Sequence, residues 1–147
     1  MLRIMTIDDY DAVFALWQSI SGFSIRSIDD SRAGIAAYLE RNPRTCVVCE
    51  RSGRIIGSIL CGHDGRRGYL YHVCVAADVR RRGVGKAMVD FCLKALREEG
   101  ITKVSLIAFT RNALGNAFWS KIGWTKRDDL NFYDYTLDGD NITVINP

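Results

Sequence analysis

The chain has 147 residues, of which 48% are hydrophobic and 25% charged, and its formal net charge is +3. This balance is typical of globular proteins and excludes disordered, collagen-like and coiled-coil chains. No segment approaches the roughly 18 apolar residues of a membrane span, and the N-terminal residues lack the pattern of a signal or transit peptide. We therefore expect a single domain over residues 1–147, with a core at about 3–137, a polar tail at 138–147 and a cytoplasmic location.

Five cysteines are scattered through apolar segments. An odd number in such surroundings indicates reduced thiols in a core rather than a disulfide framework. Cys46 and Cys49 are three positions apart in a segment that is predicted to be a strand, so their side chains point to opposite faces. They therefore cannot converge on a metal ion or form a redox pair, and we expect no metal site.

A strand and two helices are predicted in the first part of the chain. The strand covers residues 2–5, and the first helix follows with Thr6 as its N-cap and acidic residues in its first turn. A loop at 21–26 leads to a second helix, which begins near residues 29–31 and ends at Asn42-Pro43, because proline restricts the residue before it.

Strands and helices then alternate along the rest of the chain. Three strands are predicted at residues 45–50, 54–62 and 69–76, the first two joined by a hairpin turn at 51–53. They are followed by a long helix at 83–99, a strand at 103–109, a short helix around 113–121 and two strands near 123–126 and 131–137. The last ten residues are polar, and we expect them to fray.

The loop before the long helix is basic and contains glycines: Arg80-Arg81-Arg82-Gly83-Val84-Gly85-Lys86. The first N–H groups of a helix have no partners within the helix, and its dipole favours negative charge there, so this loop suits a phosphate or pyrophosphate. A P-loop is excluded because Arg80 stands where its first glycine belongs. A dinucleotide fingerprint is excluded because Met88 stands where its third glycine belongs. The pattern that does match is Arg-x-x-Gly-x-Gly.

A second motif lies downstream, Asn112-Ala113-Leu114-Gly115-Asn116-Ala117-Phe118-Trp119-Ser120-Lys121-Ile122-Gly123-Trp124. With these two motifs in this order, the sequence resembles the GNAT family of N-acetyltransferases, and the resemblance covers nearly the whole chain. It implies an α/β fold with a mixed, mostly antiparallel central sheet of about seven strands, helices on both faces and a splay near the middle. It also implies that the protein moves an acetyl group from acetyl-CoA to a primary amine by direct attack in a ternary complex.

The resemblance also implies which residues contact the coenzyme. Backbone groups of residues 81–86 would hold the pyrophosphate, and the strand at 73–75 would offer backbone groups to the pantetheine arm. Asn112 and Asn116 have the alternative role of capping the short helix. The implied coenzyme contacts are Val73, Cys74, Val75, Arg80, Arg81, Arg82, Gly83, Val84, Gly85, Lys86, Asn112, Asn116 and Trp119.

The proton-transfer residues depart from the family pattern. Trp119 stands where many members carry a tyrosine that protonates the leaving thiolate, and an indole cannot supply that proton. Trp119 either positions the thioester or is a core aromatic. Ile107 stands where some members carry a glutamate base. Tyr71 is expected on the strand face that holds Val73, where it would orient a water, and Val73 N–H would stabilise the oxyanion.

Strand alternation assigns other polar residues to structural roles. His72 would point away from Tyr71 and pack, and Cys74 would point away from the acyl group, so it is not an acyl carrier. Asp29, Asp30 and Asp64 lie on loops that could overhang the acceptor, but caps and turns explain them as well.

Other functions remain as alternatives. Since both family proton-transfer residues are missing, the domain could be an acyl-CoA sensor without efficient turnover. A second alternative is a nucleic-acid binder that uses Arg80 to Arg82, but a pyrophosphate site explains three arginines at a helix start, so we expect no nucleic-acid partner. We expect no membrane contact, and the exposed strand edges of a domain this small are compatible with a homodimer.

Overall fold

The computed structural model describes residues 1–147 and contains seven strands and four α-helices. In chain order they are β1 (Leu2–Ile4), α1 (Tyr10–Gln18), β2 (Ser24–Arg26), α2 (Arg32–Arg41), β3 (Val47–Arg51), β4 (Arg54–His63), β5 (Gly68–Val75), α3 (Val84–Glu98), β6 (Val104–Ser105), α4 (Ala113–Lys121) and β7 (Thr143–Ile145). Short 3-10 turns at Ile7–Asp9 and Ala77–Val79 precede α1 and α3. No helix combines the length and apolarity that a membrane crossing requires.

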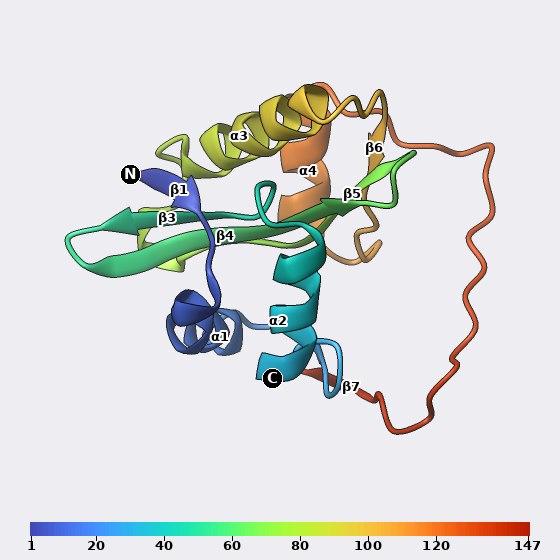
Figure 1. Ribbon diagram of the computed structural model, residues 1–147. Coiled ribbons are helices and arrows are strands. Elements are labelled where there is room, and N and C mark those ends of the chain that lie inside the picture. The colour runs from blue at the N-terminus through green and yellow to red at the C-terminus, as the bar shows by residue number, and fades with distance from the viewer.

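The central sheet has the strand order β1-β3-β4-β5-β6, and only the β5–β6 pair is parallel. Helices α1 and α2 lie on one face of this sheet, and α3 and α4 lie on the other (Figure 1). Neighbouring residues of β4 illustrate the two layers. A Cβ on Gly57 would meet Met88 of α3, whereas the hydroxyl of Ser58 accepts a hydrogen bond from Trp17 of α1 at 3.2 Å. The predicted mixed, mostly antiparallel sheet with helices on both faces is confirmed.

The hydrophobic core is one cluster of 25 buried residues between these layers. All five cysteines are buried and unpaired, as expected for core thiols. The hairpin turn between β3 and β4 is confirmed as well. Ser52 and Gly53 have positive φ angles of 52° and 75°, so they form a two-residue turn that matches the twist of the strands.

A bulge interrupts β5 and reverses its side-chain alternation. Tyr71 pairs with Leu60 of β4 and Cys74 pairs with Ser58, so three residue steps on β5 match two on β4. His72 absorbs the extra step with a φ of +50°. The expectation that Tyr71 shares a strand face with Val73 is therefore wrong, because alternation holds only without a bulge.

Contacts on the two sides of the bulge show the reversal. Before it, the ring of Tyr71 lies 6.0 Å from that of Tyr38 on α2. After it, the thiol of Cys74 lies 3.3 Å from the hydroxyl of Ser58, which faces α1. A Cβ on Gly85 of α3 would lie 3.7 Å from Val75. Tyr71 and Cys74 thus lie on the α1–α2 side of the sheet, and Val75 lies on the α3 side.

Strand β6 is much shorter than predicted. It pairs with β5 only at Gly68–Val104 and Tyr69–Ser105. The predicted strand at 103–109 is therefore wrong beyond these two residues, since residues 106–109 have no strand neighbour. From residue 70 onward β5 also has no strand on this side, so the sheet opens where a splay is predicted.

The chain after α4 differs most from the prediction. Residues 125–140 are all exposed and form an extended segment that bows away from the body (Figure 1). The strands predicted near 123–126 and 131–137 are wrong. An alternating apolar pattern makes a strand only if a neighbouring backbone is available to pair with it, and here none is.

The C-terminal residues are ordered rather than frayed. Strand β7 pairs with β2 in a two-stranded sheet, with Ile25 opposite Val144. The Nδ2 group of Asn146 donates to the carbonyls of Trp17 and Ile20 at 2.8 and 2.9 Å. The expected fraying is wrong because these polar side chains satisfy backbone groups at the end of α1.

Candidate functional site

The basic loop turns sharply between β5 and α3. Arg80 donates from Nε to the carbonyl of Val75 at 3.3 Å, which ties the loop to the end of the strand. Arg81 and Gly83 have φ angles of +65° and +80°, and Gly83 is the N-cap of α3. A non-glycine residue in the left-handed region is uncommon and costs conformational energy. The positive φ of Arg81 therefore makes this loop a candidate for a binding role.

The end of this loop is electropositive. Helix α3 has 15 residues, and the N–H groups of its first turn have no carbonyl partner within the helix. The guanidinium groups of Arg81 and Arg82 are in no ion pair, whereas Lys86 pairs with Asp90 at 2.8 Å. The loop therefore offers two unpaired guanidinium groups and a helix N-terminus to an anion, and the charge of Lys86 is already balanced.

The two glycines of the motif have different roles. Gly83 faces open space but needs its positive φ. A Cβ on Gly85 would lie 3.3 Å from the Phe118 ring of α4, so Gly85 lets α4 approach the start of α3. Glycine is therefore required at position 83 by the backbone turn and at position 85 by the packing of α4 against α3.

The strand segment 73–75 borders the opening of the sheet. Val73 and Val75 are half-buried, and Cys74 is buried. Burial raises the pKa of the Cys74 thiol to about 11, and the thiol contacts Ser58 on the α1 side. The side chain of Cys74 therefore has no role as a nucleophile, and only its backbone faces the opening.

Asn112 and Asn116 shape the turn before α4. Asn112 is the N-cap of α4, and its Oδ1 accepts from the N–H of Gly115 at 3.0 Å. Asn116 donates from Nδ2 to the carbonyls of Phe109 and Asn112, both at 2.9 Å. The capping alternative is thus realised for Asn112, and the amide of Asn116 binds the loop carbonyls. The Nδ2 group of Asn112 remains available to a ligand.

Trp119 belongs to an aromatic cluster on α4. Its ring lies 5.0 Å from that of Phe118 and 4.8 Å from that of Trp124. Its carbonyl also accepts from the N–H of Trp124 at 2.9 Å. Trp119 packs against the core but stays half-buried, and its indole N–H has no acceptor within the chain. Both roles predicted for Trp119 are compatible with this position.

The bulge on β5 brings His72 onto Asp30. Nε2 of His72 lies 2.8 Å from Oδ1 of Asp30, and the two side chains are 19% and 5% exposed. The imidazole packs between Trp17 and Phe23, with ring centroids 4.7 and 4.9 Å away. His72 is packed, as expected, but it also forms a histidine–carboxylate pair. Alternation along the strand could not reveal this pair, because the bulge creates it.

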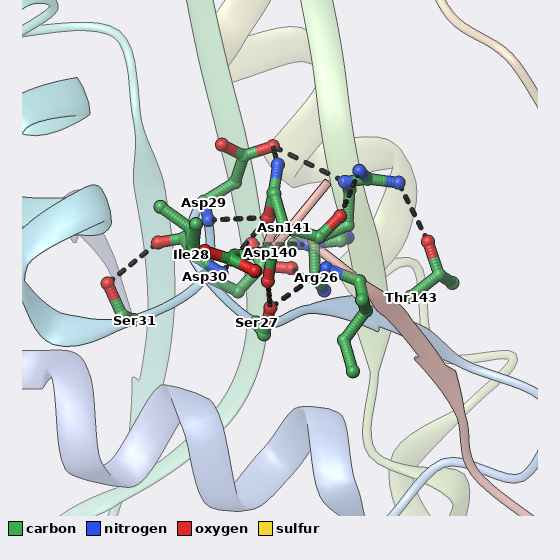
Figure 2. Close-up of polar contacts among 11 residues, drawn as sticks. Arg26, Ser27, Ile28, Asp29, Asp30, Ser31, Asp140, Asn141 and Thr143 are labelled. Atoms are coloured by element: carbon green, nitrogen blue, oxygen red, sulfur yellow. Dashed lines mark hydrogen bonds and ion pairs between the residues drawn. The ribbon is translucent and has the colours of Figure 1, made fainter. Parts of the chain in front are cut away.

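The loop that carries Asp30 is held by the C-terminal segment (Figure 2). The Oδ1 atom of Asn141 accepts from the N–H groups of Ile28 and Asp29 at 3.0 and 3.2 Å, and its Nδ2 donates to the Asp29 carboxylate at 2.9 Å. Arg26 donates to the carbonyl of Asn141 and to the hydroxyl of Thr143. No local pattern in the sequence indicates this contact, which joins residues more than 110 positions apart.

Three tyrosines line the same side of the sheet as His72. The Tyr71 ring lies 4.3 Å from that of Tyr69 and 6.0 Å, edge to face, from that of Tyr38. Burial, and then the nearby Asp29 carboxylate, raise the pKa of Tyr71, and burial raises the pKa of Tyr69 to about 12. Their phenols therefore stay protonated near neutral pH and act as hydrogen-bond donors rather than bases.

The site thus has two sides separated by an opening in the sheet. An anion-binding loop and α3 lie on one side, and a histidine–carboxylate pair and three tyrosines lie on the other. Between them, the backbone at the bulge has no register partner on β4 at residues 72–73. Such a site can hold an anionic ligand by the loop and present its far end to a base across the sheet.

Comparison with known proteins shows the family to which the chain belongs. The acetyltransferase (GNAT) family model matches residues 10–124. The acetyltransferase ECA0875 of Pectobacterium atrosepticum is 31% identical over 127 residues, which cover 86% of this chain and 89% of that protein. The acetyltransferase SG1711 of Sodalis glossinidius is 29% identical over 129 residues, which cover 88% of this chain and 89% of that protein.

Solved structures share the fold. PaiA N-acetyltransferase of Thermoplasma acidophilum, solved in complex with coenzyme A, has a TM-score of 0.75 and 14% identity, covering 97% of this chain and 95% of that chain. Ard1 of Thermoplasma volcanium has a TM-score of 0.72 and 24% identity, covering 84% of this chain and 80% of that chain. The family model and the relative at 31% identity carry the assignment: the chain belongs to the acetyltransferase (GNAT) family.

Proposed function

We propose that the protein transfers an acetyl group from acetyl-CoA to a primary amine by direct attack within a ternary complex. The observation that carries the proposal is the bulge at His72. It lies at the opening of the sheet, it frees the backbone at residues 72–73 from β4, and it turns His72 toward Asp30. One backbone irregularity thus supports both a carbonyl-binding position and a base.

The coenzyme fits the α3 side of the opening. Arg81, Arg82 and the first N–H groups of α3 would hold its pyrophosphate, and the backbone at 73–75 would bind the pantetheine arm. Asn112 would contribute its Nδ2 group. When bound, acetyl-CoA supplies an acyl group activated as a thioester. Lys86 contributes mainly through its backbone N–H, because its side chain is paired with Asp90.

The backbone N–H at the bulge would stabilise the charge that develops on the carbonyl oxygen. An oriented donor in a site closed to water is worth more than the same donor in solution. Val73 has no register partner on β4 and no β6 strand beside it, which supports its N–H in this role. No covalent enzyme intermediate is required, and the buried Cys74 thiol is unsuited to one.

His72 would take the proton from the attacking amine. Since Asp30 accepts from Nε2–H, the lone pair is on Nδ1, and Asp30 stabilises the imidazolium that forms. The amine nitrogen forms a bond to the carbonyl carbon, the carbon–sulfur bond breaks, and the thiolate leaves. The thiolate takes a proton from water, because the raised pKa of Tyr71 makes its phenol a weaker acid than a thiol. Trp119 would position the thioester, because its indole cannot supply this proton.

The proposal is tested by two measurements on one sample. Acetyl-CoA at 100 times its dissociation constant should raise the free energy of unfolding of the protein by about 2.7 kcal/mol. This gain corresponds to a rise in melting temperature of roughly 5–15 °C. ATP and NAD serve as controls. Amine-dependent release of the coenzyme thiol then measures transfer. A thermal shift with no thiol release for any amine would favour the alternative function, an acyl-CoA sensor, which the missing acid at Trp119 supports.

A further inference from the structure

A cavity of about 320 Å³ opens beside Tyr71 on the α1–α2 side of the sheet. It lies between α2, the turn after β4 and the start of β5. Its lining includes three tyrosines, two arginines and one aspartate, namely Tyr38, Tyr69, Tyr71, Arg41, Arg67 and Asp64. Its volume is at the lower end of the range for small-molecule sites, which is typical of a ligand the size of an amino acid.

The walls of the cavity are aromatic at the end nearest the bulge. Tyr69 and Tyr71 project from β5 toward Tyr38 on α2. The ring centroid of Tyr71 lies 4.3 Å from that of Tyr69 and 6.0 Å from that of Tyr38. Tyr71 precedes His72 directly in the chain, so the Tyr71 end of the cavity is the end nearer to the proposed base, although His72 itself does not line the cavity. Aromatic faces bind both alkyl chains and cationic amines, so this end suits the carbon skeleton and amine of an acceptor.

The opposite end of the cavity is cationic. Neither Arg41 nor Arg67 pairs with a carboxylate, and the only side-chain hydrogen bond of Arg67 goes to the carbonyl of Arg66 at 3.2 Å. The one carboxylate among the lining residues is that of Asp64. It accepts from the N–H groups of Arg66 and Arg67, both at 2.8 Å, which holds the pKa of Asp64 below its ordinary value.

The ring nitrogens of a third titratable residue in the lining already have partners within the chain. His63 also lines the cavity, but its Nε2 lies 2.9 Å from Glu99, and its Nδ1 accepts from the N–H of Gly65. Asp64 uses one carboxylate oxygen, Oδ1, for its own turn, and its Oδ2 has no partner within the chain. The two unpaired guanidinium groups outnumber this single carboxylate, and their planar sets of N–H donors suit a carboxylate or phosphate.

We propose that the acetyl acceptor is an amine that also carries an anionic group, a carboxylate or a phosphate, and that Arg41 and Arg67 bind this group. The inference rests on the proposed function and names the substrate class of the same site. The amine lies at the Tyr71 end, next to His72, and the anionic group lies at the arginine end. The carbon chain between them packs against Tyr38 and Tyr69.

Matched amines test the inference by binding. The protein is saturated with coenzyme A, and calorimetry measures the affinity for lysine against cadaverine and for phosphoethanolamine against ethanolamine. Each pair differs by one anionic group, and the two pairs distinguish a carboxylate from a phosphate. We expect the anionic member of at least one pair to bind about tenfold more tightly or better, which corresponds to about 1.4 kcal/mol.

Variants of the two arginines test whether the preference for anionic amines arises in the cavity. Arg41→Gln and Arg67→Gln should each abolish most of the preference, whereas Arg66→Gln, on the exposed neighbour outside the cavity lining, should retain it. Equal affinity within both pairs, or a preference that survives Arg41→Gln with Arg67→Gln, overturns the inference. Selective binding without acetyl transfer would instead overturn the proposed function and leave the anion site standing.

Discussion

Nε2 of His72 lies 2.8 Å from Oδ1 of Asp30, although 42 residues separate them along the chain. The other carboxylate oxygen of Asp30 accepts from the N–H of Arg26 at 2.7 Å. The pair thus joins the bulge on β5 to the loop between β2 and α2. The pair orients the imidazole through Nε2, and Nδ1 has no partner within the chain, which is the arrangement that the proposed base requires.

Removing the imidazole should therefore lower turnover without affecting coenzyme binding. His72→Asn keeps a polar residue that tolerates the positive φ of this position. We expect kcat to fall about 10²–10⁴-fold, the range for loss of a general base, while the thermal shift with acetyl-CoA is retained. Steady-state kinetics of thiol release would measure the loss. An unchanged kcat would remove His72 from the mechanism.

Asp30→Asn tests the positioning role separately. An amide cannot stabilise the imidazolium by charge, so kcat should fall, but by less than in His72→Asn, while the thermal shift with acetyl-CoA is retained. Asp8→Asn is the matched control, because Asp8 is exposed and contacts neither His72 nor the loop that carries Asp30. Equal kcat values for Asp30→Asn, the control and the unchanged protein would reduce Asp30 to a structural role.

The turn at Gly83 predicts a selective loss of coenzyme binding. Gly83→Asp places a negative charge and a Cβ at a φ of +80°, at the N-terminus that would hold the pyrophosphate. We expect the affinity for acetyl-CoA to weaken by about tenfold or more. Gly53→Asp is the control, since Gly53 has a φ of +75° and equally open surroundings in the β3–β4 turn. Calorimetry should show normal affinity for this control.

Trp119→Tyr distinguishes the two roles of Trp119, which are positioning of the thioester and packing in the core. A tyrosine supplies the acid that the family resemblance implies at this position, so turnover should be preserved or raised if Trp119 positions the thioester. If the indole is mainly a core group, the smaller ring should lower the melting temperature through loss of its contacts with Phe118 and Trp124. Thermal denaturation and kinetics on one preparation separate these outcomes.

The C-terminal contact should position the site from a distance. Asn141→Ala removes the acceptor for the N–H groups of Ile28 and Asp29 and the donor to the Asp29 carboxylate. We expect about 1–3 kcal/mol of destabilisation, measured by urea denaturation, together with a lower kcat. Asn131→Ala, in the exposed segment 125–140, should change neither quantity. An unaltered kcat for Asn141→Ala would show that β2 and β7 hold the loop without it.

The Arg3–Asp9 pair predicts an acid-sensitive contribution to stability. Asp9 is only 10% exposed in its side chain, and hydrogen bonds from Arg3 hold the pKa of its carboxyl below the ordinary value. A lowered pKa in the folded state means that the contribution is present above the unfolded pKa, about 4, and is lost as the pH falls through the folded pKa. Asp9→Asn should reduce this pH dependence in urea denaturation, and exposed Asp8→Asn should not.

Local patterns predicted most of the framework correctly. The residue pattern marked all four helices to within a few residues, and α1, α2 and α3 each bury apolar residues in the core. The turn at Ser52-Gly53 and the loop Arg80–Lys86 followed from residue types that tolerate left-handed backbone or attract an anion. These features depend on neighbours in the chain, so the sequence contains the information for them.

Pairing was predicted less well, because a strand needs a partner that its own residues do not specify. Residues 131–137 alternate in polarity, yet they lie in an extended exposed segment. The polar C-terminus instead forms β7, because β2 offers it an edge. Similarly, the face on which Tyr71, His72 and Cys74 lie depends on a bulge that is set by the register with β4.

By itself, the sequence determined the family and the positions of the four helices, since these follow from short-range spacing and from matching motifs. Only the tertiary structure decided the chemistry on the other side of the sheet. The pairing of His72 with Asp30, and the contact of Asn141 with the loop before α2, join residues 42 and more than 110 positions apart. Contacts of this length arise from strand register and loop packing, which no local pattern encodes.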